Sequence, residues 1–104
     1  MPRLRGTVPK PRFSRAALRD LQEILDYIAQ DSPAQARRVR DALRARCRRL
    51  ADFPDASPLR PELGEGIRVA VHGSYLILYS PRGGQGIVIE RVSHGARDLA
   101  GTLE

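Results

Sequence analysis

The tripeptide Asp31-Ser32-Pro33 separates two stretches of helical periodicity with almost no loop between them. Ser14 suits the N-cap of the first stretch, because its hydroxyl can accept a hydrogen bond from a free backbone N–H. Ser32 can cap the second stretch in the same way, and Pro33 suits its first position, where a missing N–H costs nothing. Two helices joined this tightly fold back on each other. The sequence therefore predicts an antiparallel hairpin of two helices, the second of which ends near Asp52.

Each predicted helix has one apolar face that can be buried. On the first helix this face comprises Ala17, Leu18, Leu21, Ile24, Leu25, Ile28 and Ala29. On the second helix it comprises Ala36, Val39, Leu43, Cys47 and Leu50. Tyr27 lies opposite the apolar face of the first helix, where it is either an ordinary surface residue or a contact for a partner. The two faces predict that the hairpin packs against a further layer.

That further layer is predicted to be a sheet. Pro54 blocks more helix, and the proline- and glycine-rich stretch 54–66 is typical of an irregular loop. Three apolar or alternating runs follow, at residues 67–71, 75–79 and 87–92. The turns between these runs are short, which predicts an antiparallel meander. Residues 10–13 can add a short edge strand, because a proline is tolerated there.

The expected fold class is therefore α+β: an N-terminal helical hairpin packed on an antiparallel sheet of three to four strands. We expect residues 1–9 to form a flexible basic tail, because they have no periodicity. Residues 10–104 then form a single domain, which is an ordinary size for one hydrophobic core.

The positive charge of the chain is concentrated on the second predicted helix. Between Pro33 and Ala51 seven arginines stand against one acid, Asp41, and this segment carries the whole net charge of +6. One narrow stripe along the edge of the apolar face consists of Arg37, Arg40, Arg44 and Arg48. The stripe is either a solvated face or a surface that binds a partner rich in phosphates or carboxylates.

The remaining composition narrows the class of protein further. Cys47 is the only cysteine, so no internal disulfide can form, and with His72 and His94 as the only histidines we expect no metal site and no cofactor. The N-terminus is basic but lacks the apolar stretch of a signal peptide. The longest apolar run, residues 75–79, is far too short to cross a membrane. We therefore expect a cytoplasmic protein.

Several stretches, taken in order along the chain, resemble the RelE/ParE toxin superfamily and in particular its ParE-like branch. They are residues 14–21 (SRAALRDL), 24–29 (ILDYIA), 31–33 (DSP), 50–54 (LADFP), 60–63 (RPEL), 73–79 (GSYLILY) and 91–98 (RVSHGARD). The resemblance implies the toxin of a type II toxin–antitoxin module. It also implies a cytoplasmic hetero-oligomer in which a ParD-like antitoxin holds the toxin inactive.

The two branches of this superfamily imply different targets. RelE-like members cut messenger RNA on the ribosome, whereas ParE-like members inhibit DNA gyrase and are not nucleases. If the chain were a metal-independent endoribonuclease, Arg68, Arg91 and His94 would be its candidate catalytic residues. Ser74 stands where related nucleases often carry an arginine, and Gly95 follows His94 where they carry an aromatic residue. The gyrase-binding, non-enzymatic interpretation is therefore favoured, with these residues as candidate partner contacts: Tyr27, Arg37, Arg40, Arg44, Arg48 and Arg97.

Overall fold

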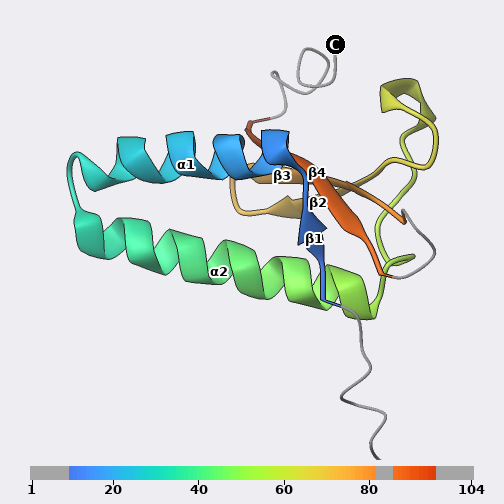
Figure 1. The fold of residues 1–104 in the computed structure, drawn as a ribbon, viewed down its shortest axis with the longest axis horizontal. Coiled ribbons are helices and arrows are strands. Elements are labelled where there is room, and N and C mark those ends of the chain that lie inside the picture. The colour runs from blue at the N-terminus through green and yellow to red at the C-terminus, as the bar shows by residue number, and fades with distance from the viewer. Residues whose placement is uncertain (1–9, 82–85, 96–104) are drawn as a thin grey trace, which may run out of the picture.

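The computed structural model describes residues 10–81 and 86–95, and it has two layers (Figure 1). One layer is a hairpin of two helices, α1 (Arg15–Ala29) and α2 (Pro33–Asp52). The other layer is a four-stranded sheet, and α1 packs closely on its strand β4 (Val88–His94). The predicted α+β fold class is confirmed.

The helices begin and end where the sequence predicts them. The Ser14 hydroxyl accepts a hydrogen bond from the Ala17 N–H at 2.9 Å and donates one to the Glu90 carbonyl at 2.8 Å. It therefore caps α1 and ties the start of that helix to β4. The Ser32 hydroxyl accepts from the Gln35 N–H at 3.0 Å, which caps α2 immediately after the end of α1.

The sheet has the strand order β1-β4-β3-β2. Strands β2 (Arg68–His72), β3 (Tyr75–Ser80) and β4 form the predicted antiparallel meander. The short strand β1 (Arg12–Phe13) pairs with β4 in parallel, so that the sheet is mixed rather than wholly antiparallel. The reason is topological: the chain leaves β1 through the hairpin and the meander before it returns beside β1 in the same direction.

Both faces of the central strand β3 are buried. On the face toward the helices, Ile77 and Tyr79 pack with Leu43, Cys47 and other residues of the main core. On the opposite face, Leu76 and Leu78 form a second apolar cluster with Ile67, Val69 and the half-buried Leu63. Leu63 belongs to the short 3-10 helix η2 (Pro61–Leu63), which lies in the predicted loop region. The uninterrupted apolar run at β3 is therefore a consequence of double burial.

One expected core position is wrong. Leu18 is 55% exposed, whereas Ala17, its neighbour on α1, is fully buried. At about 100° of rotation per residue, Leu18 lies at the flank of the stripe that Ala17, Leu21 and Ile24 direct toward the sheet. In the part of the chain that the structure describes, no helix combines the length and the apolar character needed to span a bilayer.

Candidate functional site

A mostly apolar hollow lies between α1 and the ends of β3 and β4. It has a volume of about 280 Å³, and its lining residues are Glu23, Ile24, Tyr27, Ile28, Tyr75 and His94. Ile24 and Ile28 are four residues apart, so both reach it from one face of α1. Tyr27 is 75% exposed beside them. The structure thus brings Tyr27 and His94, which the sequence nominated for different roles, to the same hollow.

His94 is held at the rim of this hollow by the strand register. It pairs with Tyr75 across β3 and β4, and the two rings lie with their centroids 5.0 Å apart at an interplanar angle of 34°. The next residue, Gly95, donates its N–H to the Ser74 carbonyl at 2.9 Å and has φ of +94°, a conformation suited to glycine. His94 is therefore an exposed ring stacked against a tyrosine at the end of the sheet.

A second hollow lies on the α2 side of Tyr75. It has a volume of about 340 Å³ and is lined by Gln35, Arg38, Val39, Ala42, His72, Gly73, Ser74 and Tyr75. Because Tyr75 lines both hollows, its side chain stands between one recess under α1 and another beside α2. We call the two hollows together the Tyr75 groove.

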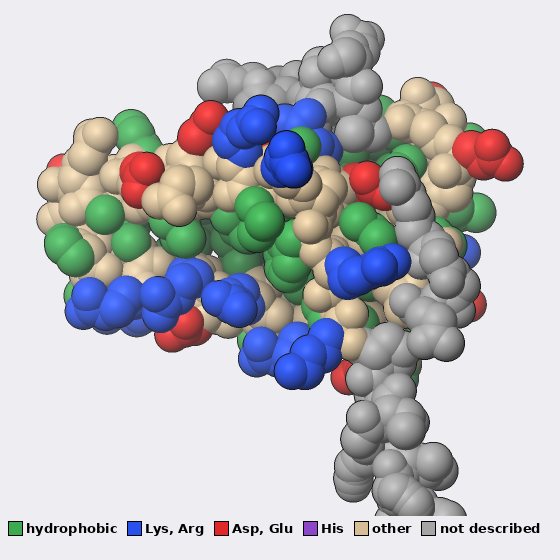
Figure 2. Space-filling model, viewed as in Figure 1, with side chains coloured by type: hydrophobic (Ala, Val, Ile, Leu, Met, Phe, Trp, Pro, Cys, Tyr) green, Lys and Arg blue, Asp and Glu red, His purple; other side chains and the backbone are tan. Residues whose placement is uncertain are grey.

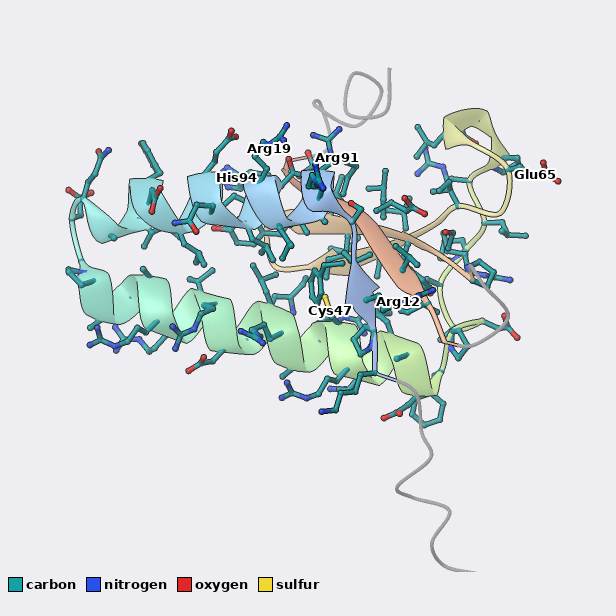
Figure 3. The ribbon with its side chains drawn as sticks, in the orientation of Figure 1. Arg12, Arg19, Cys47, Glu65, Arg91 and His94 are labelled. Carbon is teal, nitrogen blue, oxygen red and sulfur yellow. The ribbon has the colours of Figure 1, made fainter. Side chains whose placement is uncertain are left out.

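Arg91, a candidate catalytic residue, is committed to an ion pair. Its guanidinium donates to both carboxylate oxygens of Asp20 on α1, from Nε at 2.8 Å and from an Nη at 2.9 Å. The Val92 N–H donates to the same carboxylate at 2.9 Å. The hydrogen bond from Arg91 to Asp20 raises the pKa of Arg91 above its ordinary value. Figure 3 shows Arg91 and His94 at the same end of the sheet, beside α1.

Arg68, a second candidate, also has a structural role. Its guanidinium donates to the Ser57 carbonyl and lies 3.4 Å from the Asp55 carboxylate, both in the loop that follows α2. The Arg68 side chain is only 20% exposed. It therefore fastens this loop to the edge strand β2.

The strand register separates Arg68 from His94. His94 lies opposite Tyr75, which lies opposite His72 on β2. Arg68 precedes His72 by four residues, which is about 13 Å along the strand, and β2 and β4 lie about 10 Å apart across β3. Arg91 and His94 do line a common hollow of about 250 Å³, together with the Asp20 carboxylate. The three candidate catalytic residues thus do not converge on one point.

The arginine stripe follows the length of α2 (Figure 2). Arg37, Arg40, Arg44 and Arg48 are all exposed, and Arg40 pairs with its neighbour Asp41 at 3.1 Å. Arg97, the remaining candidate partner contact, lies outside the described residues.

The C-terminal half of the stripe, formed by Arg44 and Arg48, lies beside strand β1. Arg44 and Arg48 line a hollow of about 180 Å³ with Lys10, Pro11 and Phe13. The sequence alone does not connect Lys10 with α2, because nothing local indicates that β1 lies beside that helix.

The described residues contain neither a cluster of metal ligands nor an exposed thiol. Across residues 10–81 and 86–95, no group of three or more His, Cys, Asp or Glu side chains could hold a metal ion. Cys47 is 2% exposed and faces the sheet from α2 (Figure 3). Burial raises the pKa of its thiol to about 11, which keeps the sulfur protonated and unreactive near neutral pH.

The chain matches a known family over most of its length. The model for the ParE toxin of the type II toxin–antitoxin system parDE matches residues 12–99. Among solved structures, the fold is similar to a chain described as the chromosomal ParDE TA system from P. aeruginosa, with a TM-score of 0.71 and 19% sequence identity. That match covers 86% of this chain and 99% of the other. No curated protein matches the chain. The chain therefore belongs to the ParE toxin family of type II toxin–antitoxin systems.

Proposed function

We propose that this toxin acts by binding DNA gyrase in the cytoplasm, without catalysis, and that a ParD-like antitoxin neutralises it in a hetero-oligomer. Membership of the ParE family supports both partners. Gyrase inhibition is the activity that the resemblance implies, and the parDE system pairs its toxin with an antitoxin. Binding is favoured over catalysis because Arg68, Arg91 and His94 do not lie together around one point.

Metal-free RNA cleavage needs a base, an acid and a cation around one phosphate. Arg91 is occupied by Asp20, and Arg68 is occupied by the loop at Ser57 and Asp55. A carboxylate beside Arg91 also repels a phosphate group. His94 alone cannot supply the base, the acid and the cation, so this arrangement favours a binding protein.

The Tyr75 groove is the surface that best suits the antitoxin. Its lining is largely apolar, with Ile24, Ile28 and Val39 contributed by the two helices. An amphipathic segment can bury its apolar side chains in such a groove, as in other helix-in-groove complexes. Arg37 and Arg38 lie near the same end of α2 and can pair with acidic side chains of that segment.

The decisive test compares both targets with one preparation of purified toxin. We expect the toxin to block supercoiling of relaxed plasmid by gyrase, and to leave messenger RNA intact on translating ribosomes. Addition of the antitoxin restores supercoiling. His94→Ala, which removes the candidate catalytic side chain that lies outside the ion pairs of Arg68 and Arg91, leaves gyrase inhibition unchanged. Normal supercoiling together with ribosome-dependent cleavage of messenger RNA would reject the proposal.

A ribosome-dependent endoribonuclease is the second candidate function. It is favoured by one observation, namely that Arg91 and His94 line the same hollow. On that hypothesis His94→Ala abolishes cleavage on ribosomes, and Asp20→Asn, which removes the negative charge that repels a phosphate beside Arg91, increases it. Cleavage that is unaffected by either substitution would eliminate this hollow as an active site.

A further inference from the structure

We propose that Lys10, Arg44 and Arg48 form a binding site for the phosphodiester backbone of nucleic acid. The site goes beyond the proposed function. It lies where β1 passes the C-terminal half of α2, whereas the Tyr75 groove lies where α1 and the N-terminal half of α2 meet the ends of β3 and β4. Binding there requires neither the antitoxin nor gyrase.

The first observation is the convergence of three cations from distant parts of the sequence. Arg44 and Arg48 are four residues apart on α2, so their side chains lie about 5–6 Å apart at their bases. Lys10, the only lysine of the chain, reaches the same hollow of about 180 Å³ from the residue pair before β1. Pro11 and Phe13 provide its apolar wall. A concave surface lined by three cations is a site for an anion.

The second observation is that this charge is uncompensated. Over the residues that the structure places, no carboxylate lies within 4.0 Å of the charged groups of Lys10, Arg44 or Arg48. The acids nearest to these arginines along α2 are Asp41, which pairs with Arg40, and Asp52, which follows Arg48 by four residues and forms no ion pair with it. Arg91, Arg68 and Arg60, by contrast, each have an acidic partner. The positive potential at the hollow is thus available to a ligand.

The third observation favours a phosphate over a carboxylate. A phosphodiester presents two charged non-bridging oxygens on a tetrahedral phosphorus, so guanidinium and ammonium groups can approach it from several directions, whereas the two oxygens of a carboxylate lie in one plane. Lysine also binds phosphate well as a point charge.

The extent of the stripe favours a polymer over a single ion. Arg37 and Arg40 continue the line away from the hollow along α2, and the span from Arg37 to Arg48 is about 16 Å. A regular polyanion such as a nucleic acid backbone can contact such a row, with one phosphate per strand for about every 3.4 Å. Phe13, which forms part of the wall of the hollow, is half-buried against the hydrophobic core, so only part of its ring is open to a base. We therefore expect binding that does not depend on base sequence.

The test is a salt titration of binding to a fluorescein-labelled 20-base-pair duplex of random sequence, followed by fluorescence polarisation. The unmodified toxin of residues 1–104 is compared with the site variant Lys10→Gln/Arg44→Gln/Arg48→Gln. The control variant is Arg15→Gln/Arg19→Gln/Arg60→Gln, which removes the same charge from positions outside α2. Because each lost phosphate contact reduces the salt slope by about 0.9, we expect the site variant to flatten the plot of log K against log salt by about 2.7. Its affinity falls by more than about tenfold, while the control variant keeps most of the affinity and slope.

A conservative variant separates loss of contacts from loss of structure. Arg44→Lys/Arg48→Lys keeps the charge, so we expect it to retain the salt slope of the wild type while binding somewhat more weakly. A single-stranded RNA of the same length forms a parallel arm, in which each contact contributes a slope of about 0.7. The polymer that loses more affinity in the site variant is the preferred source of the phosphates.

Two results would overturn the proposal. Equal losses in the site and control variants would mean that only net charge matters. Displacement of the duplex by poly-glutamate at equal charge concentration, with poly-glutamate binding abolished in the site variant, would assign the hollow to an acidic protein.

Discussion

Asp20 and Arg91 are 71 residues apart in the sequence, and two parallel hydrogen bonds of 2.8 and 2.9 Å join their side chains. Their side chains are only 13% and 29% exposed. The same carboxylate accepts the Val92 N–H, so one acid on α1 satisfies both a side chain and the backbone of β4. This pair therefore attaches the first helix to the sheet. It also occupies Arg91, the arginine that a nuclease would need to bind a phosphate.

Removal of the Asp20 carboxylate should destabilise the toxin. Asp20→Ala takes an acceptor from the Arg91 guanidinium and from the Val92 N–H, and bonds to charged groups in partly buried positions contribute about 1.5–3 kcal/mol. We expect urea denaturation to show a free energy of unfolding lower by about 2 kcal/mol. Asp31→Ala, at the exposed turn between the helices, serves as the control and should change stability by less than about 0.5 kcal/mol. Equal values for the two variants would show that the pair contributes no net stability.

The buried hydroxyl of Tyr79 provides a second test of stability. Tyr79 is fully buried, and its hydroxyl donates to the Pro54 carbonyl at 2.9 Å, which fixes the chain where it leaves α2. Tyr79→Phe leaves that carbonyl without its donor and should cost about 1–2 kcal/mol in thermal or urea unfolding. Tyr75→Phe is the matched control. Among the described residues its hydroxyl has no hydrogen bond, so that substitution should be nearly neutral. A loss for Tyr75→Phe as large as that for Tyr79→Phe would contradict this assignment.

The helices could be predicted from the sequence because their signals are local. Ser14, Ser32 and Pro33 act on the backbone within one turn, and the observed caps use the same hydroxyl groups. The strands of the meander were predicted by their apolar runs and short connections. The parallel pairing of β1 could not be predicted, because two residues carry no periodicity that shows which strand they join.

The candidate site was harder to predict because its determinants are distant in sequence. Asp20 occupies the polar face of α1. In the sequence, an acid there that pairs with Arg91 cannot be distinguished from one that only contacts water. Lys10 meets Arg44 only through the placement of β1 beside α2. A charge stripe on one helix is visible in the sequence, but the cation that completes a pocket on another element is not.

The stability of the toxin should fall at alkaline pH through Cys47. Burial raises the pKa of this thiol from 9.0 to about 11, so above pH 9 the unfolded chain loses a proton that the folded chain retains. This contribution is complete below pH 9 and is lost as the pH rises toward 11, at about 1.4 kcal/mol per pH unit. Urea unfolding between pH 8 and 10.5 should show this decline, and Cys47→Ala should have a shallower one. The two proteins are compared by the slope of stability against pH, because the substitution also leaves a small cavity that lowers the stability at every pH. If the stability of the wild type and of Cys47→Ala fell with pH at the same slope, the prediction for Cys47 would be wrong.

Tyr27 should be an anchor for the antitoxin. Its ring is 75% exposed and lines the hollow that Ile24 and Ile28 form on α1, and exposed aromatic residues beside apolar pockets often dominate binding energy. Because Tyr27 makes little contact with the core, Tyr27→Ala should leave folding intact while weakening the complex by about 2 kcal/mol, or roughly thirtyfold in Kd. Calorimetric titration with the antitoxin measures this directly. Phe53 at the end of α2 is 67% exposed but lies away from the Tyr75 groove, so Phe53→Ala should bind normally. If Phe53→Ala weakened the complex and Tyr27→Ala did not, the antitoxin would bind the opposite end of the hairpin.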